Sequence, residues 1–307
     1  MKILLLGKNG QVGQALERAL TPLAGPGELV SLDRSNGGDL SQLDQLAATV
    51  RHLRPQVIVN AAAYTAVDKA ESEPEQARLV NALAPEVLAK EAQALGAWLV
   101  HYSTDYVFDG SGTRQWLETD ATAPLNVYGQ TKLEGERLIQ AHCTRHLIFR
   151  TSWVYAAHGS NFAKTMLKLA QERERLTVID DQWGAPTGAE LLAAVTATAI
   201  GQLNMAGLAG NESLAGLYHL AAGGETTWHQ YASHVIGRAK ALRPDLPWAV
   251  QDIAPVPSSA FVTAARRPHN SRLDTRKLQA AFGINLPDWQ QGVDDMLAQV
   301  LTSTPSK

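Results

Sequence analysis

The sequence predicts an α/β protein built on a doubly wound parallel sheet, with a smaller α/β substrate domain. In the first half, short apolar runs alternate with amphipathic helical patterns, and a glycine-rich turn separates the first run from the first helix. Apolar runs without polar alternation indicate strands that are covered by helices on both faces. The 307 residues, 45% of them hydrophobic, suffice for two domains, because single cores stop growing near about 250–300 residues.

Each element of the first half has its own signal. The apolar runs predict five strands: Ile3–Leu6, Leu29–Asp33, Val57–Asn60, Trp98–Ser103 and Leu147–Thr151. Helical spacing predicts helices at Gln11–Leu20, between a Ser41 cap and Pro55, at Pro85–Leu95 before the cap residue Gly96, and near Tyr128–Ile139. With right-handed crossovers, this order predicts a Rossmann-type domain.

The second half is less regular and richer in Trp, Pro and Gly loops. We therefore expect residues 1–152, joined by part of 176–215, to form the dinucleotide-binding domain. Residues 153–307 are expected to form the substrate domain, with interleaved boundaries.

Composition restricts the partners and the compartment. The 27 basic and 30 acidic residues give a net charge of −3, so a face for nucleic acid or anionic lipid is not expected. The single cysteine, Cys143, excludes an internal disulfide and a cysteine-rich zinc module, and no other metal cluster stands out. The first residues lack the apolar run of a signal peptide, and polar residues interrupt the uncharged stretch Leu191–Asn211. We expect a soluble cytoplasmic protein.

A glycine-rich loop follows the first predicted strand and opens the first helix. Gly7, Gly10 and Gly13 stand at G-x-x-G-x-x-G spacing, which lets backbone N–H groups at a helix N-terminus approach a pyrophosphate. Asp33 follows Gly13 by twenty residues, where a carboxylate binds the adenosine ribose of a dinucleotide. Alternatively, Asp33 is an ordinary turn aspartate without a role in cofactor binding. Lys8 and Arg34 would suit a 2′-phosphate, so NADH and NADPH both remain open.

Tyr128 and Lys132 stand at i and i+4, on one face of a predicted helix. A nearby ammonium lowers the pKa of a phenol, which can then exchange a proton with a carbonyl oxygen. Ser103 and Thr104 end a predicted strand, where a hydroxyl can polarise the same carbonyl. Thr104 or Ser103, Tyr128 and Lys132 therefore predict carbonyl reduction.

These motifs resemble those of the extended short-chain dehydrogenase/reductases. They are the three glycines, the segment Asn60–Asp68, the segment Ser103–Phe108, and Tyr128-x-x-x-Lys132. Three further segments make the chain similar to the branch that reduces dTDP-4-dehydro-L-rhamnose: Arg150–Tyr155, Asn161–Met166 and Arg267–Ser271. The resemblance covers nearly the whole chain.

The resemblance implies a role for each matching residue. The residues that would line the cofactor are Gly10, Gln11, Val12, Asp33, Asp39, Leu40, Ala63, Tyr64 and Thr65. Tyr128 would donate the proton to the sugar C4 oxygen, Lys132 would lie on the nicotinamide ribose, and Thr104 would polarise the carbonyl. Contact with the sugar is implied for Thr104, Asp105 and Trp153, and Asn161 and Arg267 are the candidates for binding the nucleotide diphosphate. Alternatively, Trp153 only covers the end of the core, and Arg266 and Arg267 are a solvated pair at the surface.

The implied reaction converts dTDP-4-dehydro-β-L-rhamnose to dTDP-β-L-rhamnose with NADPH or NADH, in the supply of cell-surface polysaccharide such as O-antigen. A dehydratase is disfavoured, because Tyr106 follows Asp105 where that family has a second carboxylate. A nucleotide-sugar epimerase and a non-catalytic NAD(P)-binding regulatory subunit remain the alternatives. The family is also associated with Mg²⁺ at a homodimer contact. Here Gln14, Ala15, Gln290 and Gln291 offer no carboxylate partner for Glu190, which places a metal-bridged dimer in doubt.

Overall fold

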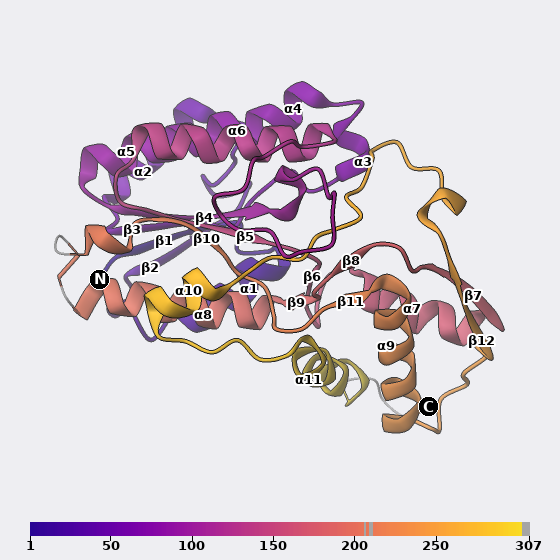
Figure 1. Cartoon of the computed structure of the whole chain (residues 1–307). Helices are drawn as coiled ribbons and strands as arrows, with labels where there is room; N and C mark the ends of the chain where they lie inside the picture. The colour runs from indigo at the N-terminus through magenta and orange to yellow at the C-terminus, as the bar shows by residue number, and fades with distance from the viewer. Residues whose placement is uncertain (206, 209–210, 303–307) are drawn as a thin grey trace.

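A computed structural model describes residues 1–205, 207–208 and 211–302 and contains one central sheet of six parallel strands (Figure 1). The strand order is β10-β5-β4-β3-β1-β2. The strands are β1 (Ile3–Leu6), β2 (Leu29–Leu32), β3 (Val57–Asn60), β4 (Trp98–Thr104), β5 (His146–Thr151) and β10 (Gly216–His219). The order reverses beside β1, as in doubly wound sheets, so the predicted fold class is confirmed.

Alternate side chains of each strand pack on opposite faces of the sheet and form its core. Ile3 and Leu5 pack with α1 (Gln11–Leu20) and α8 (Ala189–Met205) below the sheet in Figure 1. Leu4 and Leu6 pack with α2 (Leu43–Leu53) and α5 (Ala84–Leu95) above it, on the side that also carries α6 (Val127–His142). Burial on both faces explains why the strands read as unbroken apolar runs.

Most predicted boundaries agree to within a few residues, with two instructive differences. Ser41 does not cap α2: Gln42 occupies the cap position, and the Ser41 hydroxyl donates to Asp39 Oδ1 at 2.8 Å. A π-helical turn, η1 (Leu79–Leu83), leads into α5 and was not predicted from the apolar spacing. Gly96 does adopt the left-handed cap conformation, with φ of 65°.

A second apolar core lies outside the sheet. It is formed by α7 (Phe162–Glu172), α9 (Trp228–Leu242) and α11 (Trp289–Thr302), with β7 (Arg175–Ile179) and β12 (Asp252–Val256) beside them. The remaining elements are α3 (Val67–Ala70), α4 (Pro74–Arg78), η2 (Asp105–Val107), β6 (Val154–Tyr155), β8 (Trp183–Gly184), β9 (Thr187–Gly188), η3 (Glu212–Leu214), β11 (Thr226–Thr227), η4 (Ser258–Ala260) and α10 (Arg276–Phe282). Because α8 and β10 return to the sheet, the chain passes between the two cores more than once. The domain boundaries stay a prediction.

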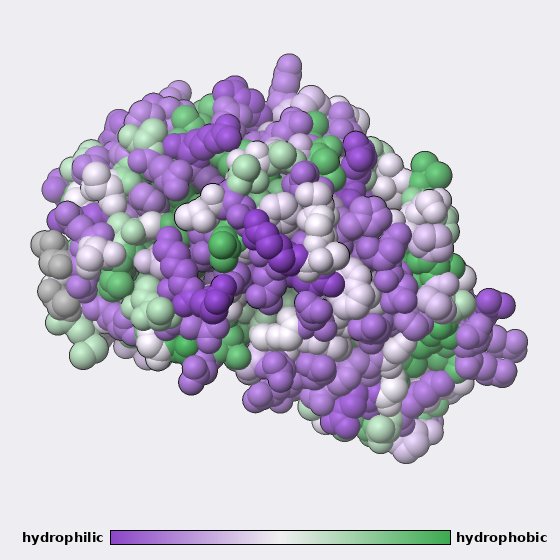
Figure 2. Space-filling model, viewed as in Figure 1, coloured by the Kyte–Doolittle hydropathy of each residue, from purple (hydrophilic) through white to green (hydrophobic). Residues whose placement is uncertain are grey.

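Polar side chains cover most of the face shown in Figure 2, and apolar side chains are scattered among them. In the described ranges, every helix is too short or too polar to cross a bilayer.

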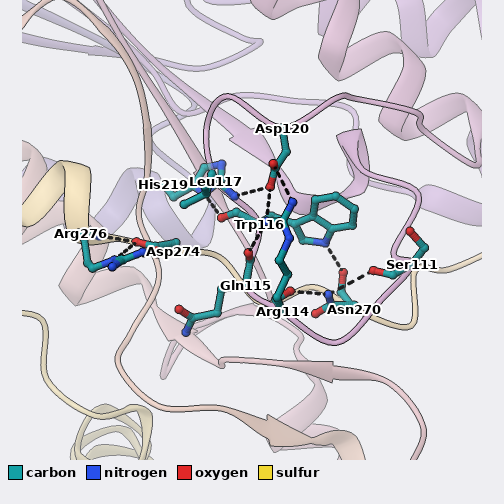
Figure 3. A network of polar contacts seen from close by, with 10 residues as sticks. All are labelled: Ser111, Arg114, Gln115, Trp116, Leu117, Asp120, His219, Asn270, Asp274 and Arg276. Atoms are coloured by element: carbon teal, nitrogen blue, oxygen red, sulfur yellow. Dashed lines mark hydrogen bonds and ion pairs between the residues drawn. The ribbon is translucent and has the colours of Figure 1, made fainter.

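A network of polar contacts joins the segment after η2 to the C-terminal third of the chain (Figure 3). Asn270 Nδ2 donates to the carbonyl of Arg114 at 2.7 Å, and Trp116 Nε1 donates to the carbonyl of Asn270 at 3.0 Å. Arg114 also pairs with Asp120 at 2.7 Å. Asn270 thus fixes the loop that follows η2, a role that the sequence motif did not reveal.

Candidate active site

A cleft of about 860 Å³ opens at the carboxyl ends of the sheet strands, where doubly wound sheets bind their ligands. Most of the predicted site residues line it. They are Gly7, Gly10, Gln11, Val12, Asp33, Asp39, Leu40, Ala63, Thr65, Thr104, Asp105, Tyr128, Lys132 and Trp153. Gly13, Tyr64, Asn161 and Arg267 are not among its lining residues.

The glycine loop brings the first turn of α1 to the floor of this cleft. Gly10 is the N-cap residue and offers no side-chain cap, so N–H groups of the first turn remain available to an anion. Gly7 has a φ of +85°, which favours glycine. A Cβ on Gly13 would lie 2.0 Å from the Gly7 carbonyl oxygen, so Gly13 permits the close packing of loop and helix. Its role is structural support beneath the lining residues.

Asp33 stands at the end of β2 and is held in place by its neighbours. Its Oδ1 accepts from the amide of Ser35 at 2.8 Å, and its Oδ2 accepts from Asn9 Nδ2 at 2.8 Å. Lys8 Nζ lies 3.6 Å from Oδ2. The hydrogen bonds from Ser35, helped by Asn9 and Lys8, lower the pKa of Asp33 to about 2. A permanently ionised acceptor at this position suits ribose hydroxyls.

Tyr128 and Lys132 lie in the first two turns of α6, facing the cleft. Asn126 caps this helix by accepting from the Gly129 amide at 2.8 Å. Burial raises the pKa of Tyr128 to about 12, against a hydrogen bond with Thr104 that lowers it, so the phenol is protonated at neutral pH. The lowered pKa expected from the neighbouring lysine is therefore wrong for the free protein, because burial outweighs it. Lys132 Nζ donates to the Tyr102 carbonyl at 2.5 Å, and burial lowers its pKa to about 8.

Thr104 is the last residue of β4, and Asp105 is the first residue of η2. The Thr104 hydroxyl donates to Asp105 Oδ1 at 3.1 Å, and it also bonds Tyr128. Asp105 is 2% exposed, and burial raises its pKa to about 7, although hydrogen bonds with Ser271 and Thr104 oppose the rise. Its Oδ2 has no hydrogen-bond partner among the described residues. Such a group can bind a hydroxyl either as donor or as acceptor.

Trp153 lies in the cleft wall in a strained conformation, with φ of 49°. Its ring stacks on Trp228, with centroids 3.7 Å apart and planes at 16°. Gly184 leaves room behind it, since a Cβ there would lie 2.7 Å from the indole. Trp228 Nε1 in turn donates to Gln182 at 3.1 Å. Trp228 was missed from the sequence, because it lies far along the chain and no local motif marks it.

Asn161 and Arg267 are engaged elsewhere. Asn161 caps α7 by accepting from the Lys164 amide at 3.1 Å, and its Nδ2 donates to Gln11 Oε1 at 3.0 Å. Arg267 pairs with Asp68, with Nη2 2.6 Å from Oδ2. Arg267 therefore does not form a solvated pair with Arg266, which was the alternative considered from the sequence. A diphosphate would have to compete with Asp68 for its guanidinium.

Tyr64 does not line the cleft and is bonded to its neighbours instead. Its hydroxyl donates to Glu73 Oε2 at 2.7 Å, and its amide donates to Asn81. Ala63 and Thr65 on either side do line the cleft, which fits backbone contacts along this segment.

The residues around Glu190 do not fit a Mg²⁺ site. Glu190 forms an ion pair with Arg18, a cation that would repel a metal ion. Across the ranges that the structure describes, no three His, Cys, Asp or Glu side chains gather as a metal-binding group.

Comparisons with known proteins agree with this geometry. Residues 1–302 match the family model described as the RmlD substrate binding domain. The chain is 58% identical to the dTDP-4-dehydrorhamnose reductase of Shigella flexneri, over 99% of each chain. It is 45% identical to that of Burkholderia thailandensis, over 97% of this chain and 100% of the relative.

Solved structures show the same likeness. The dTDP-4-dehydrorhamnose reductase of Clostridium acetobutylicum superposes with a TM-score of 0.87 at 32% identity, covering 98% of this chain and 99% of that one. The enzyme of Bacillus anthracis, solved in complex with NADP, gives a TM-score of 0.84 at 32% identity, covering 97% and 100%. The chain therefore belongs to the RmlD family, the dTDP-4-dehydrorhamnose reductases.

Proposed function

We propose that this chain reduces the C4 carbonyl of dTDP-4-dehydro-β-L-rhamnose to give dTDP-β-L-rhamnose, with NADPH or NADH as reductant. The observation that carries the proposal is the assembly of Thr104, Tyr128 and Lys132 in one cleft with the glycine loop and Asp33. The family to which the chain belongs supports the same substrate.

The cofactor would lie along the floor of the cleft. The free N–H groups of Gln11 and Val12 suit its pyrophosphate, and Asp33 suits its adenosine ribose. Asp39 and Leu40 would lie by the adenine, and Ala63 and Thr65 along the chain of the dinucleotide. When bound, NAD(P)H supplies the hydride to the sugar C4.

The chain's own residues manage the proton. Tyr128, protonated at neutral pH, donates its phenolic proton to the C4 oxygen as negative charge develops there. Thr104 polarises the same oxygen through its hydroxyl. A charged Lys132 stabilises the phenolate that remains.

The substrate would occupy the part of the cleft near Trp153 and Asp105. The stacked indoles of Trp153 and Trp228 offer a flat apolar wall for the deoxysugar, and Asp105 offers a carboxyl for its hydroxyls. Arg267 would bind the diphosphate by exchanging its pairing with Asp68.

The test follows NADPH and NADH oxidation separately in the presence of dTDP-4-dehydrorhamnose, with and without EDTA. Stoichiometric oxidation and formation of dTDP-rhamnose are expected. The variant Tyr128→Phe should lower kcat by about 10²–10⁴-fold while cofactor binding is retained. Tyr218→Phe is the matched control, because the Tyr218 hydroxyl donates to the Leu214 carbonyl inside the sheet core. Isomerisation without net oxidation would indicate an epimerase, and binding without turnover a regulatory subunit.

We also propose a cytoplasmic location, in keeping with a nucleotide-sugar substrate, and a homodimer, by analogy with the family. Sedimentation of the purified chain tests the second point, and a monomer would contradict it.

A further inference from the structure

A buried polar chain stands behind the lysine of the site. Lys132 Nζ lies 3.1 Å from His101 Nε2, and His101 Nδ1 lies 3.2 Å from Asn60 Nδ2. Lys132 is 2% exposed, and His101 and Asn60 are each 1% exposed. Asn60 on β3 and His101 on β4 are register partners at the carboxyl end of the sheet.

The orientation of Asn60 determines the tautomer of His101. Asn60 Oδ1 accepts from the Ala62 amide at 3.1 Å, so its NH₂ group must face the imidazole. Nδ1 of His101 is then an acceptor, and a neutral imidazole carries its proton on Nε2. The ring is neutral, because burial holds the pKa of His101 well below its usual value.

The proton on Nε2 points at Lys132. An ammonium has only donors, so it would meet this N–H with another N–H, whereas an uncharged amine can accept from it. The Tyr102 carbonyl can accept from Nζ in either state, and it accepts more strongly from the ammonium. The contact with His101 therefore favours the uncharged lysine.

We propose that His101 is a positioning residue of the site, which holds Lys132 through Nε2–H and favours its uncharged form in the free protein. The inference deepens the proposed function and rests on it for its catalytic meaning. Burial keeps the phenol of Tyr128 protonated, with a pKa raised to about 12, and an uncharged Lys132 adds no positive charge that would lower this pKa. The acid therefore keeps the proton that it must give to the sugar.

The other charged groups on neighbouring elements act less directly. Glu136, one turn further along α6, favours the ammonium, but both of its oxygens are bonded to Arg150 of β5. Asp105 and Tyr106 of η2, with Tyr128, line the cleft. Ion pairs engage most of the charges on α3, α4 and α5, as Asp68–Arg267, Lys69–Glu73, Arg78–Glu134, Arg51–Glu91 and Lys90–Glu86. Glu75 of α4 stands outside these pairs and is exposed to solvent.

The first test uses the wild-type chain and needs no substrate. Nitrogen-15 NMR of histidine-labelled protein, free of cofactor, reports which ring nitrogen of His101 carries the proton. Protonation of Nε2 with an unprotonated Nδ1 is expected. The opposite tautomer, or a charged ring at neutral pH, would overturn the proposal.

The second test reads the lysine itself. In His101→Gln the side-chain oxygen can accept from the ammonium, so the titration of Lys132, followed by ¹³Cε NMR, should move to higher pH by about one unit or more. His219→Gln is the matched control, since His219 is equally buried on β10 but bonds the Trp116 carbonyl. An unmoved titration in a folded His101→Gln protein would refute the role.

Kinetics then separate the inference from the proposed function. If the ammonium assists the reaction, kcat/KM should fall at a higher pH in His101→Gln than in wild type, by the same shift. A shifted lysine titration in a protein that does not turn over dTDP-4-dehydrorhamnose would support the role of His101 and contradict the proposed function. An unshifted lysine titration in an active enzyme would contradict the role of His101 and support the proposed function.

Discussion

Replacing Glu136 by Gln is expected to cost more stability than any other single carboxylate change on α6. Glu136 and Arg150 form a two-pronged ion pair at 2.8 and 2.6 Å. Their side chains are only 2% and 4% exposed. Phe108 covers the guanidinium, whose carbon lies 5.0 Å from the ring centroid. The amide would leave the Arg150 charge buried without its counter-ion.

The size of the effect follows from this burial. Removing one partner of a buried ion pair costs about 3–5 kcal/mol, because an uncompensated charge remains in the interior. The same helix offers a matched control in Glu134, which binds Arg78 with equally short contacts but with side chains 34% and 52% exposed. Pairs at the surface contribute about 0–1 kcal/mol, so Glu134→Gln should be nearly neutral.

Urea unfolding of the three proteins, followed by circular dichroism, measures both free energies. The cleft supplies a second readout: loss of the Glu136 carboxylate should also lower the pKa of Lys132, since that carboxylate favours the ammonium. Losses of stability of similar size in the two variants would refute the argument from burial.

Three other changes test the cleft. Gly13→Ala should weaken cofactor binding about tenfold or more in a fluorescence titration, because the added Cβ would lie 2.0 Å from the Gly7 carbonyl oxygen. Gly237→Ala on α9 is the control, since a Cβ there meets open space. Since the pKa of Asp33 is lowered to about 2, its contribution to stability and to cofactor affinity should be constant above about pH 4 and lost as the pH falls toward 2. Trp228→Ala should raise KM for the nucleotide sugar about 2- to 12-fold, through loss of the stack on Trp153. An unchanged KM would show that Trp153 holds its position alone.

The fold was predictable where a residue pattern reports burial directly. Unbroken apolar runs such as Ile3–Leu6 identify strands covered on both faces, and Gly96 marks a helix end through its left-handed conformation. The predicted cap at Ser41 was wrong, because its hydroxyl donates to Asp39 Oδ1 and the cap position is occupied by Gln42, which makes no side-chain cap. The π-helical turn at Leu79–Leu83 leaves apolar spacing almost unchanged, so the sequence carries little sign of it.

The site was predictable where its residues stand close together in the chain. The glycine loop and the Tyr128–Lys132 pair are local motifs, and they do line one cleft. Contacts between distant segments were not predictable. Neither the stacking of Trp228 on Trp153 nor the capture of Arg267 by Asp68 has a local signature. Whether Asn161 and Arg267 reach the substrate stays a prediction.

The position of Tyr128 depends on how α6 is fixed at both ends of its first half. At its start, Asn126 caps the helix and also donates to the Arg266 carbonyl at 2.7 Å, which joins the catalytic helix to the segment that carries Arg267. Two turns later, the Glu136–Arg150 pair anchors the helix to β5. A movement of the Arg267 segment upon diphosphate binding would therefore displace the N-terminus of α6. Through the bond from Asn126 to the Arg266 carbonyl, such a movement would reach Tyr128 in the first turn of α6.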